Sequence, residues 1–344
     1  MKGPARLPVI DALRGVAALA VCWYHVSNGF PSYPTSAALR ASGSEGWLGV
    51  SIFFVISGFI MPYAMHRAGY ELGSCWRFLA KRVVRIDLPC FAALAAGVAL
   101  SILTGPLRIW ETPPAQITLG QVLLHLGYLN YIAGSSFLNG TLWTLAIELQ
   151  YYLLLTLLFP ILVAPKTAMR LFPLALLGAL AFVESTPVLI FHHGYLFLIG
   201  IVTFQYRARL LSRRLHLGLL VALVAGGLLT VGPWSTAAGT ATALAIAFLP
   251  ERGSPLRFFG DISYSLYLVH IPVGLRVVAW GEPRAHGPAA QLAVAGAAVL
   301  ASMGAAWLLW RLVEAPAQRW ASAIRYRAPE PAAAAPPAAD LKAG

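Results

Sequence analysis

Three ionisable side chains interrupt one of the most apolar stretches of the sequence, DALRGVAALAVCWYHV at residues 11–26. They are Asp11, Arg14 and His25. Arg14 and His25 are eleven positions apart, which in an α-helix places both on one face, about 16 Å apart along the axis. A guanidinium can hold a phosphate, and an imidazole can accept a proton near neutral pH. The spacing therefore predicts an anion-binding group and a proton acceptor at two depths of one helix.

The same three residues have a simpler interpretation, in which Asp11 neutralises Arg14 at a membrane interface and His25 reaches toward solvent. However, a lone ionisable group costs about 2.5–3.5 kcal/mol at the centre of a spanning helix on insertion scales, so such groups usually face a cavity or a partner. This cost favours a functional site for Arg14 and His25, whereas Asp11 fits either interpretation.

A second apolar segment, GTLWTLAIELQYYLL at residues 140–154, carries a carboxylate. Glu148 lies about two turns from one end of the predicted helix, with Trp143 near the interface and Tyr152 four residues on. A carboxylate inside a membrane needs a partner. We predict that this partner is His25, which lies at a similar depth.

A third segment, FFGDISYSLYLVHIP at residues 258–272, places Ser263, Tyr267 and His270 on one stripe of a helix. Hydrogen bonding between helices explains Ser263 and Tyr267 equally well. His270, close to Pro272, can also be a core histidine at a kink. We therefore expect these three residues to support a site or the packing around it.

Membrane helices must position all of these groups, because 58% of the residues are hydrophobic, only 11% are charged and the mean hydropathy is +0.71. About 25% of the residues in soluble domains are charged. We predict an all-α, polytopic transmembrane helical bundle of about ten spans. The candidate spans are residues 8–29, 46–65, 87–105, 141–163, 168–185, 188–206, 215–232, 236–250, 259–280 and 288–312.

The lysines and arginines set the orientation of this bundle. With the amino terminus in the cytoplasm, cytoplasmic segments hold 20 of these residues and external segments hold 3. Both termini are then cytoplasmic. The apolar segment 117–133 is predicted to be an interfacial or re-entrant helix, because a crossing there would place Arg207 and Arg214 outside. The net charge of +12 follows from this topology and from contact with anionic lipids, which argues against nucleic-acid binding.

Neither the last residues of the sequence nor the cysteines indicate a second folded domain or a metal centre. Residues 1–327 are predicted to form one integral-membrane domain, and residues 328–344, APEPAAAAPPAADLKAG, a disordered cytoplasmic tail. The three cysteines, Cys22, Cys75 and Cys90, are odd in number and lie in or beside spans. This pattern argues against a disulfide framework or a metal site.

Several of these segments together resemble the acyltransferase family 3 membrane proteins, which include polysaccharide O-acetyltransferases. IDALRGVAALAVCWYH looks like the family's first-span signature, an Arg and a His separated by ten residues. GWLGVSIFFVISGFIM (46–61), FLAKRVVRIDLP (78–89), GTLWTLAIELQYYLL (140–154), FGDISYSLYLVHIPV (259–273) and VEAPAQR (313–319) resemble further motifs, in order. Ser51 and Leu149 depart from the pattern, which commonly has Asp and Glu at these positions.

The resemblance implies transfer of an acyl group, usually acetyl, from cytoplasmic acyl-CoA to a hydroxyl of a glycan or glycolipid across the plasma (inner) membrane. Arg14 would bind the donor and act with the catalytic pair His25 and Glu148. His25 would accept the proton of the acceptor hydroxyl, and Glu148 would orient the imidazole. The basic loop would also bind donor phosphates, through Arg77, Lys81, Arg82 and Arg85.

Other membrane functions use the same residue types. A proton-coupled transporter or a flippase of envelope precursors would employ buried His, Glu and Arg in a relay. A transporter would be favoured by inverted repeats, which the sequence does not show. The identity of the acceptor, the length of the acyl group, direct transfer against an acyl-enzyme, and the oligomeric state are open at this point.

Overall fold

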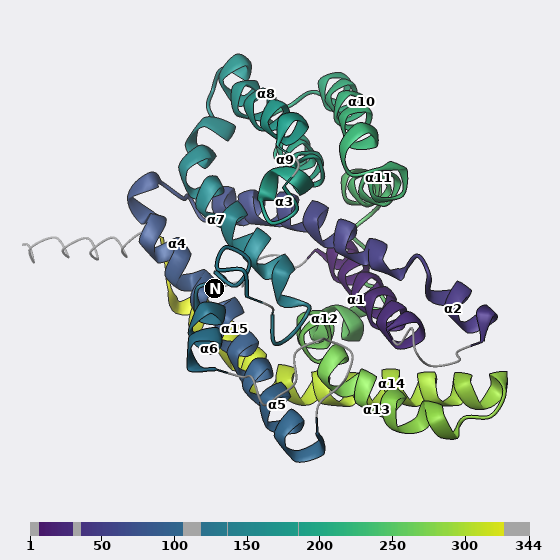
Figure 1. Ribbon diagram of the computed structural model, residues 1–344. Helices are drawn as coiled ribbons and strands as arrows, with labels where there is room; N and C mark the ends of the chain where they lie inside the picture. Colours follow the sequence, from purple (N-terminus) through teal and green to yellow (C-terminus); the bar gives the residue numbers. More distant parts are fainter. Residues whose placement is uncertain (1–6, 30–35, 106–117, 136, 185, 327–344) are drawn as a thin grey trace, which may run out of the picture.

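The computed structural model describes residues 7–29, 36–105, 118–135, 137–184 and 186–326, and these residues form helices and connecting turns without β-strands (Figure 1). The all-α prediction is confirmed. The predicted tail, residues 328–344, lies outside the described residues.

Each of the ten predicted spans coincides with helical structure. The corresponding helices are α1 (Pro8–Asn28), α3 (Gly49–Arg67), α5 (Leu88–Thr104), α7 (Leu142–Leu162), α8 (Thr167–Val183), α9 (Gly194–Arg207), α10 (Arg213–Thr230), α11 (Pro233–Phe248), α12 (Arg257–Val269) with α13 (Leu275–Gly281), and α14 (Pro288–Leu309). Shorter helices join or extend them, namely α2 (Ala37–Gly43), α4 (Cys75–Arg82), α6 (Leu119–Leu126) and α15 (Ala315–Ala323).

Among the described residues, seven continuous helical segments are long and apolar enough to cross a membrane. The other three predicted spans correspond to α8, α9 and α11, with 17, 14 and 16 residues. A helix needs about 20 residues to cross a typical bilayer upright, with a range of about 17–25. The chain therefore has the make-up of a multi-pass membrane protein, while the count of ten crossings stays a prediction.

The segment 117–133 does not form a spanning helix in its described part. Its helix α6 has eight residues, about 12 Å at the α-helical rise. The ends of the surrounding connection also lie near each other, because Thr104 accepts a hydrogen bond from Arg276 and Asn139 donates one to the Leu268 carbonyl. Positions 268 and 276 are only about 12 Å apart along a helix, so both ends of the connection lie toward the same end of the bundle.

Helix α1 packs closely against α12, which brings the first and third polar segments together. Glycines allow this approach: a Cβ atom at Gly260 would lie 2.4 Å from the Asp11 carbonyl oxygen, and one at Gly15 would lie 2.8 Å from the Phe259 Cβ atom. Small residues at such crossings are typical of membrane helices. The part of α1 that carries Arg14 is therefore held close to the α12 backbone.

Helix α3 lies between two groups of helices. It contacts α1 and α7 as well as α9 and α11, and α8 to α11 gather on one side of it in Figure 1. One hydrophobic core fills the space among α3, α7, α8 and α9, and a second fills the space among α1, α5, α12 and α14. The polar groups described below lie where α1, α3, α7 and α12 meet.

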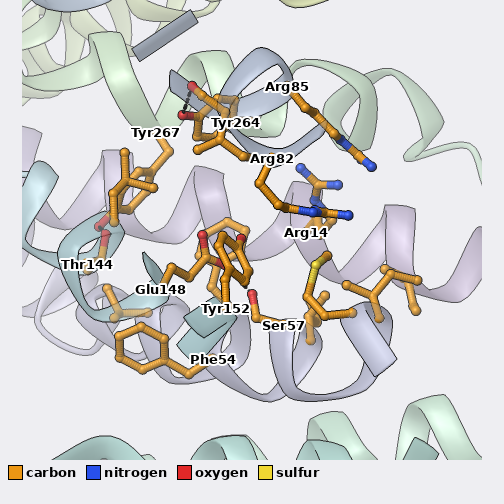
Figure 2. Close-up of a pocket in the computed structure, with 18 of the residues that line it drawn as sticks. Arg14, Phe54, Ser57, Arg82, Arg85, Thr144, Glu148, Tyr152, Tyr264 and Tyr267 are labelled. Carbon is orange, nitrogen blue, oxygen red and sulfur yellow. Dashed lines mark hydrogen bonds between the residues drawn. The ribbon is translucent and has the colours of Figure 1, made fainter. Parts of the chain in front are cut away.

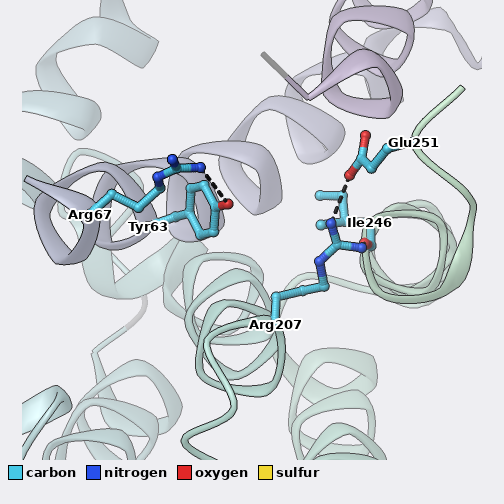
Figure 3. Close-up of polar contacts among 5 residues, drawn as sticks. All are labelled: Tyr63, Arg67, Arg207, Ile246 and Glu251. Carbon is cyan, nitrogen blue, oxygen red and sulfur yellow. Dashed lines mark hydrogen bonds and ion pairs between the residues drawn. The ribbon is translucent and has the colours of Figure 1, made fainter. Parts of the chain in front are cut away.

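Two of the arginines predicted to be cytoplasmic lie at helix ends and form polar contacts there (Figure 3). Arg207, at the end of α9, forms an ion pair of 2.8 Å with Glu251 and donates to the Ile246 carbonyl at 3.1 Å. Arg67, at the end of α3, donates to the Tyr63 hydroxyl at 3.4 Å. These contacts give both arginines local structural partners.

Candidate active site

A cavity with about 910 Å³ of empty space, including its open mouth, lies among α1, α3, α7 and α12 and the turn that follows α4. Arginines line one side of it, Glu148 and Tyr152 lie in the middle, and Thr144 and Tyr267 lie on the opposite side (Figure 2). The cavity thus has a basic end and a neutral polar end.

Of the predicted site residues, the cavity brings together Arg14, Arg82, Arg85, Glu148, Tyr152 and Tyr267.

The basic end holds more positive than negative charge. Arg14 and Arg82 both lie within electrostatic reach of Arg85, and Glu314 is the carboxylate that faces them. Arg82 is 5% exposed and its guanidinium packs on the rings of Phe78 and Tyr152, yet its Nε atom has no hydrogen-bond partner among the described residues. A buried cationic donor without a partner is costly. This end can therefore bind an anion.

Glu314 was not among the predicted site residues. It is 2% exposed, and it accepts hydrogen bonds from the Ser265 hydroxyl at 2.6 Å and from the Gln318 side chain at 2.9 Å. These donors fix the carboxylate beside the arginines. The sequence offered one signal, since Glu314 is an acidic residue directly after a long apolar segment, within the VEAPAQR motif.

In the middle of the cavity, Glu148 accepts a hydrogen bond from Ser57 of α3 and lies beside the Tyr152 hydroxyl, one turn along α7. At the far end the hydroxyls of Thr144 and Tyr267 hydrogen bond to each other at 2.9 Å. Apolar side chains fill much of the remaining wall. The cavity therefore passes from charged to uncharged polar groups along its length.

His25 does not line this cavity. Its Nδ1 atom lies 3.0 Å from the Val21 carbonyl oxygen and 3.2 Å from Nε2 of His270. The His270 ring is fully buried and packs in turn against Tyr267, with ring centroids 5.9 Å apart. Tyr267 thus belongs both to the cavity wall and to the surroundings of the histidine pair.

The predicted pairing of Glu148 with His25 is wrong, because each has a different partner. Glu148 bonds to Ser57, and His25 bonds to His270. The prediction rested on similar depth in the membrane, and depth does not determine which side of a helix faces which neighbour. Helix α1 packs against α12, so the residue that reaches His25 comes from the end of α12.

Two of the predicted donor-binding residues lie outside the main cavity. Arg77 donates to the Tyr326 carbonyl at 2.8 Å, and the Lys81 ammonium lies 5.3 Å from the centre of the Tyr326 ring. Lys81 also lines a second cavity with Arg325. Burial raises the pKa of the Tyr326 hydroxyl, so this phenol stays neutral and does not offset the positive charge of Lys81.

The remaining predicted residues have supporting positions. Ser263 is buried and donates to the Gly260 carbonyl at 2.8 Å. Trp143 packs against His193, with ring centroids 5.6 Å apart, and Asp11 presents its backbone to Gly260. These residues do not line the main cavity.

Three site residues lie in π-helical turns, which interrupt the α-helices in the described chain. Arg85 lies in Val83–Asp87, His270 opens His270–Gly274, and Glu314 closes Trp310–Glu314. Such turns are rare and frequently mark functional positions. Each turn contains a proline or is followed closely by one, which gives a local reason for the departure from α-helical hydrogen bonding.

Comparison with known proteins shows the family of this chain. Residues 7–311 match the family described as acyltransferase domain, known as acyltransferase 3. The chain belongs to this family. The acyltransferase MdmB of Streptomyces mycarofaciens is 30% identical to it over 154 residues, which are 43% of this chain and 38% of MdmB. The match thus covers well under half of that relative's length. No solved structure matches this chain.

Proposed function

We propose that this acyltransferase moves an acyl group, most simply acetyl, from cytoplasmic acyl-CoA to a hydroxyl of a cell-envelope or extracellular glycan at the inner (plasma) membrane. The proposal is based on one observation, a continuous cavity that begins at Arg14, Arg82 and Arg85 and ends at Tyr267. Tyr267 packs against His270 of the histidine pair. A long donor with an anionic head and an uncharged arm fits such a graded cavity.

The basic end is suited to the anionic part of the donor. Arg14 and Arg85 can each offer a planar pair of N–H groups to a phosphate, and Arg82 has an unpartnered Nε–H in the same place. The pantetheine arm would then extend past Glu148 and Tyr152. Arg77 and Lys81, which lie near Tyr326, would face the outer part of the donor.

The reaction itself requires one proton acceptor near the thioester. As the acceptor hydroxyl gives its proton to His25, its oxygen forms a bond with the thioester carbonyl carbon. The carbon–sulfur bond then breaks, and the thiolate of CoA takes up the proton from His25. Atoms and charge balance in these steps without an acyl-enzyme intermediate. Tyr267 is close enough to the histidine pair to border the path of the thioester.

Purified protein in liposomes, supplied with acetyl-CoA labelled in the acetyl group and with envelope glycans, tests this function. Label in a glycan ester supports the proposal. Label retained on the protein would indicate an acyl-enzyme, and ion flux without label transfer would indicate a transporter. Mass spectrometry of envelope glycans from a strain that lacks the protein would identify the acceptor by the ester that disappears.

A further inference from the structure

The histidine pair defines which nitrogen of His25 carries its proton. The Nδ1 atom of His270 lies 3.0 Å from the Leu266 carbonyl oxygen, and the Nδ1 atom of His25 lies 3.0 Å from the Val21 carbonyl oxygen. A carbonyl oxygen only accepts hydrogen bonds, so each Nδ1 atom must carry hydrogen. The neutral His270 ring then has an unprotonated Nε2 atom.

This Nε2 atom faces His25. It lies 3.2 Å from the His25 Nδ1 atom, so the Nδ1–H group of His25 is shared between the Val21 carbonyl and His270. Both contacts require the proton of neutral His25 to sit on Nδ1. The lone pair of the His25 imidazole is therefore on Nε2, and no described protein group hydrogen bonds to that atom.

The fold holds His270 in this orientation with side-chain hydrogen bonds to the backbone around it. Asn139 donates to the Leu268 carbonyl at 2.9 Å, two residues before the π-helical turn begins at His270. Arg276 donates to the Pro272 carbonyl and ties this turn to Ser101 of α5 at 2.6 Å. Irregular helix leaves backbone carbonyls without their usual donors, and these side chains supply them.

We propose that His270 is a positioning residue, which keeps His25 in the Nδ1–H tautomer so that Nε2 is the base that accepts the proton of the acceptor hydroxyl. This inference rests on the proposed function. When Nε2 takes the proton, the positive charge of the imidazolium is stabilised through its Nδ1–H bond to His270 Nε2. His270 thus takes the role predicted for Glu148, as the third group that orients a base.

Two substitutions separate positioning from packing. His270→Gln keeps an acceptor, the Oε1 atom, that can receive the Nδ1–H of His25, whereas His270→Phe keeps an aromatic ring of similar size without an acceptor. We expect His270→Phe to lower kcat roughly tenfold to a hundredfold, with the KM for acetyl-CoA changed less than about twofold, since general-base catalysis contributes about 10²–10⁴-fold. His270→Gln should retain more of kcat than His270→Phe. Equal losses, or a more active Phe variant, would overturn the proposal.

A second measurement does not depend on activity. Nitrogen NMR of the wild-type protein labelled with ¹⁵N-histidine, with His25→Gln used for assignment, reports which ring nitrogen carries hydrogen. A protonated Nδ1 and an unprotonated Nε2 in His25 are expected, and the reverse tautomer would refute the assignment even if a variant fails to fold. Absence of any acetyl transfer by the wild type would instead count against the proposed function.

Discussion

The two ends of α1 lie in contrasting surroundings. Around Arg14, the positive charges of Arg82 and Arg85 face the carboxylate of Glu314, and a buried N–H of Arg82 has no described protein partner. Around His25, the ring nitrogens of the histidine pair form a chain of hydrogen bonds that ends at a backbone carbonyl. The first environment therefore has an N–H group that an anion could accept a hydrogen bond from. In the second, every ring nitrogen except Nε2 of His25 has a hydrogen-bond partner among the described residues. The first environment suits the binding of an anion, and the second suits the proposed transfer of a proton.

The largest expected contrast between the two ends is that they face opposite sides of the membrane. Reporter domains fused after Thr104 and after Asn139 should both read external, because these residues hydrogen bond to Arg276 and to Leu268, near the histidine end. A fusion after Arg67 should read cytoplasmic. Opposite readings at Thr104 and Asn139 would mean that the intervening segment crosses, and the assignment of sides to the two ends would be lost.

Removing the proton acceptor should have the largest effect on catalysis. His25→Ala is expected to lower acetyl transfer by about 10²–10⁴-fold, the usual contribution of a general base. The KM for acetyl-CoA should change little, because His25 does not line the main cavity, where the donor is proposed to bind. Transfer rates and membrane abundance of the variant are the measurements. A rate near that of the wild type would remove His25 from the mechanism.

At the other end, Arg14→Lys should affect donor binding. Lysine keeps the charge but loses the planar fork of N–H groups. A hydrogen bond to a charged group contributes about 1.5–3 kcal/mol, so we expect the KM for acetyl-CoA to rise roughly tenfold or more. Arg207→Lys is the matched control, because Arg207 pairs with Glu251 outside the cavity, and its KM should stay unchanged. Equal effects in both variants would indicate a general loss of stability, and Arg14 would then have no specific role in donor binding.

The sequence predicted the positions of the ionisable residues along α1 better than the contacts between helices. The spacing of Arg14 and His25 placed them correctly at two depths, since helical periodicity depends only on the local chain. The partner of His25 could not be obtained in this way, because it depends on which helix packs against α1, and that helix is α12. Glu314 was missed for a related reason: its site role arises in a π-helical turn, and the pattern of apolar residues does not report such turns.

The smallest expected effect tests whether the cavity and the histidine pair act separately. Glu148→Gln keeps an oxygen that can accept the Ser57 hydrogen bond and removes the negative charge, so a loss of only several-fold in kcat is expected. Within the described part of the chain, Glu148 and His270 share no hydrogen-bond partner. Changes at sites without shared partners usually add in free energy within about 0.3–0.5 kcal/mol.

The double variant Glu148→Gln with His270→Gln should therefore lose the product of the two single losses in kcat. If the double variant is no slower than the slower single variant, the two residues act as one unit. Glu148 would then influence His25 in the reacting complex although it bonds to Ser57 in the structure. That outcome would restore the pairing predicted from the sequence, and the main cavity and the histidine pair would have to be treated as one functional site.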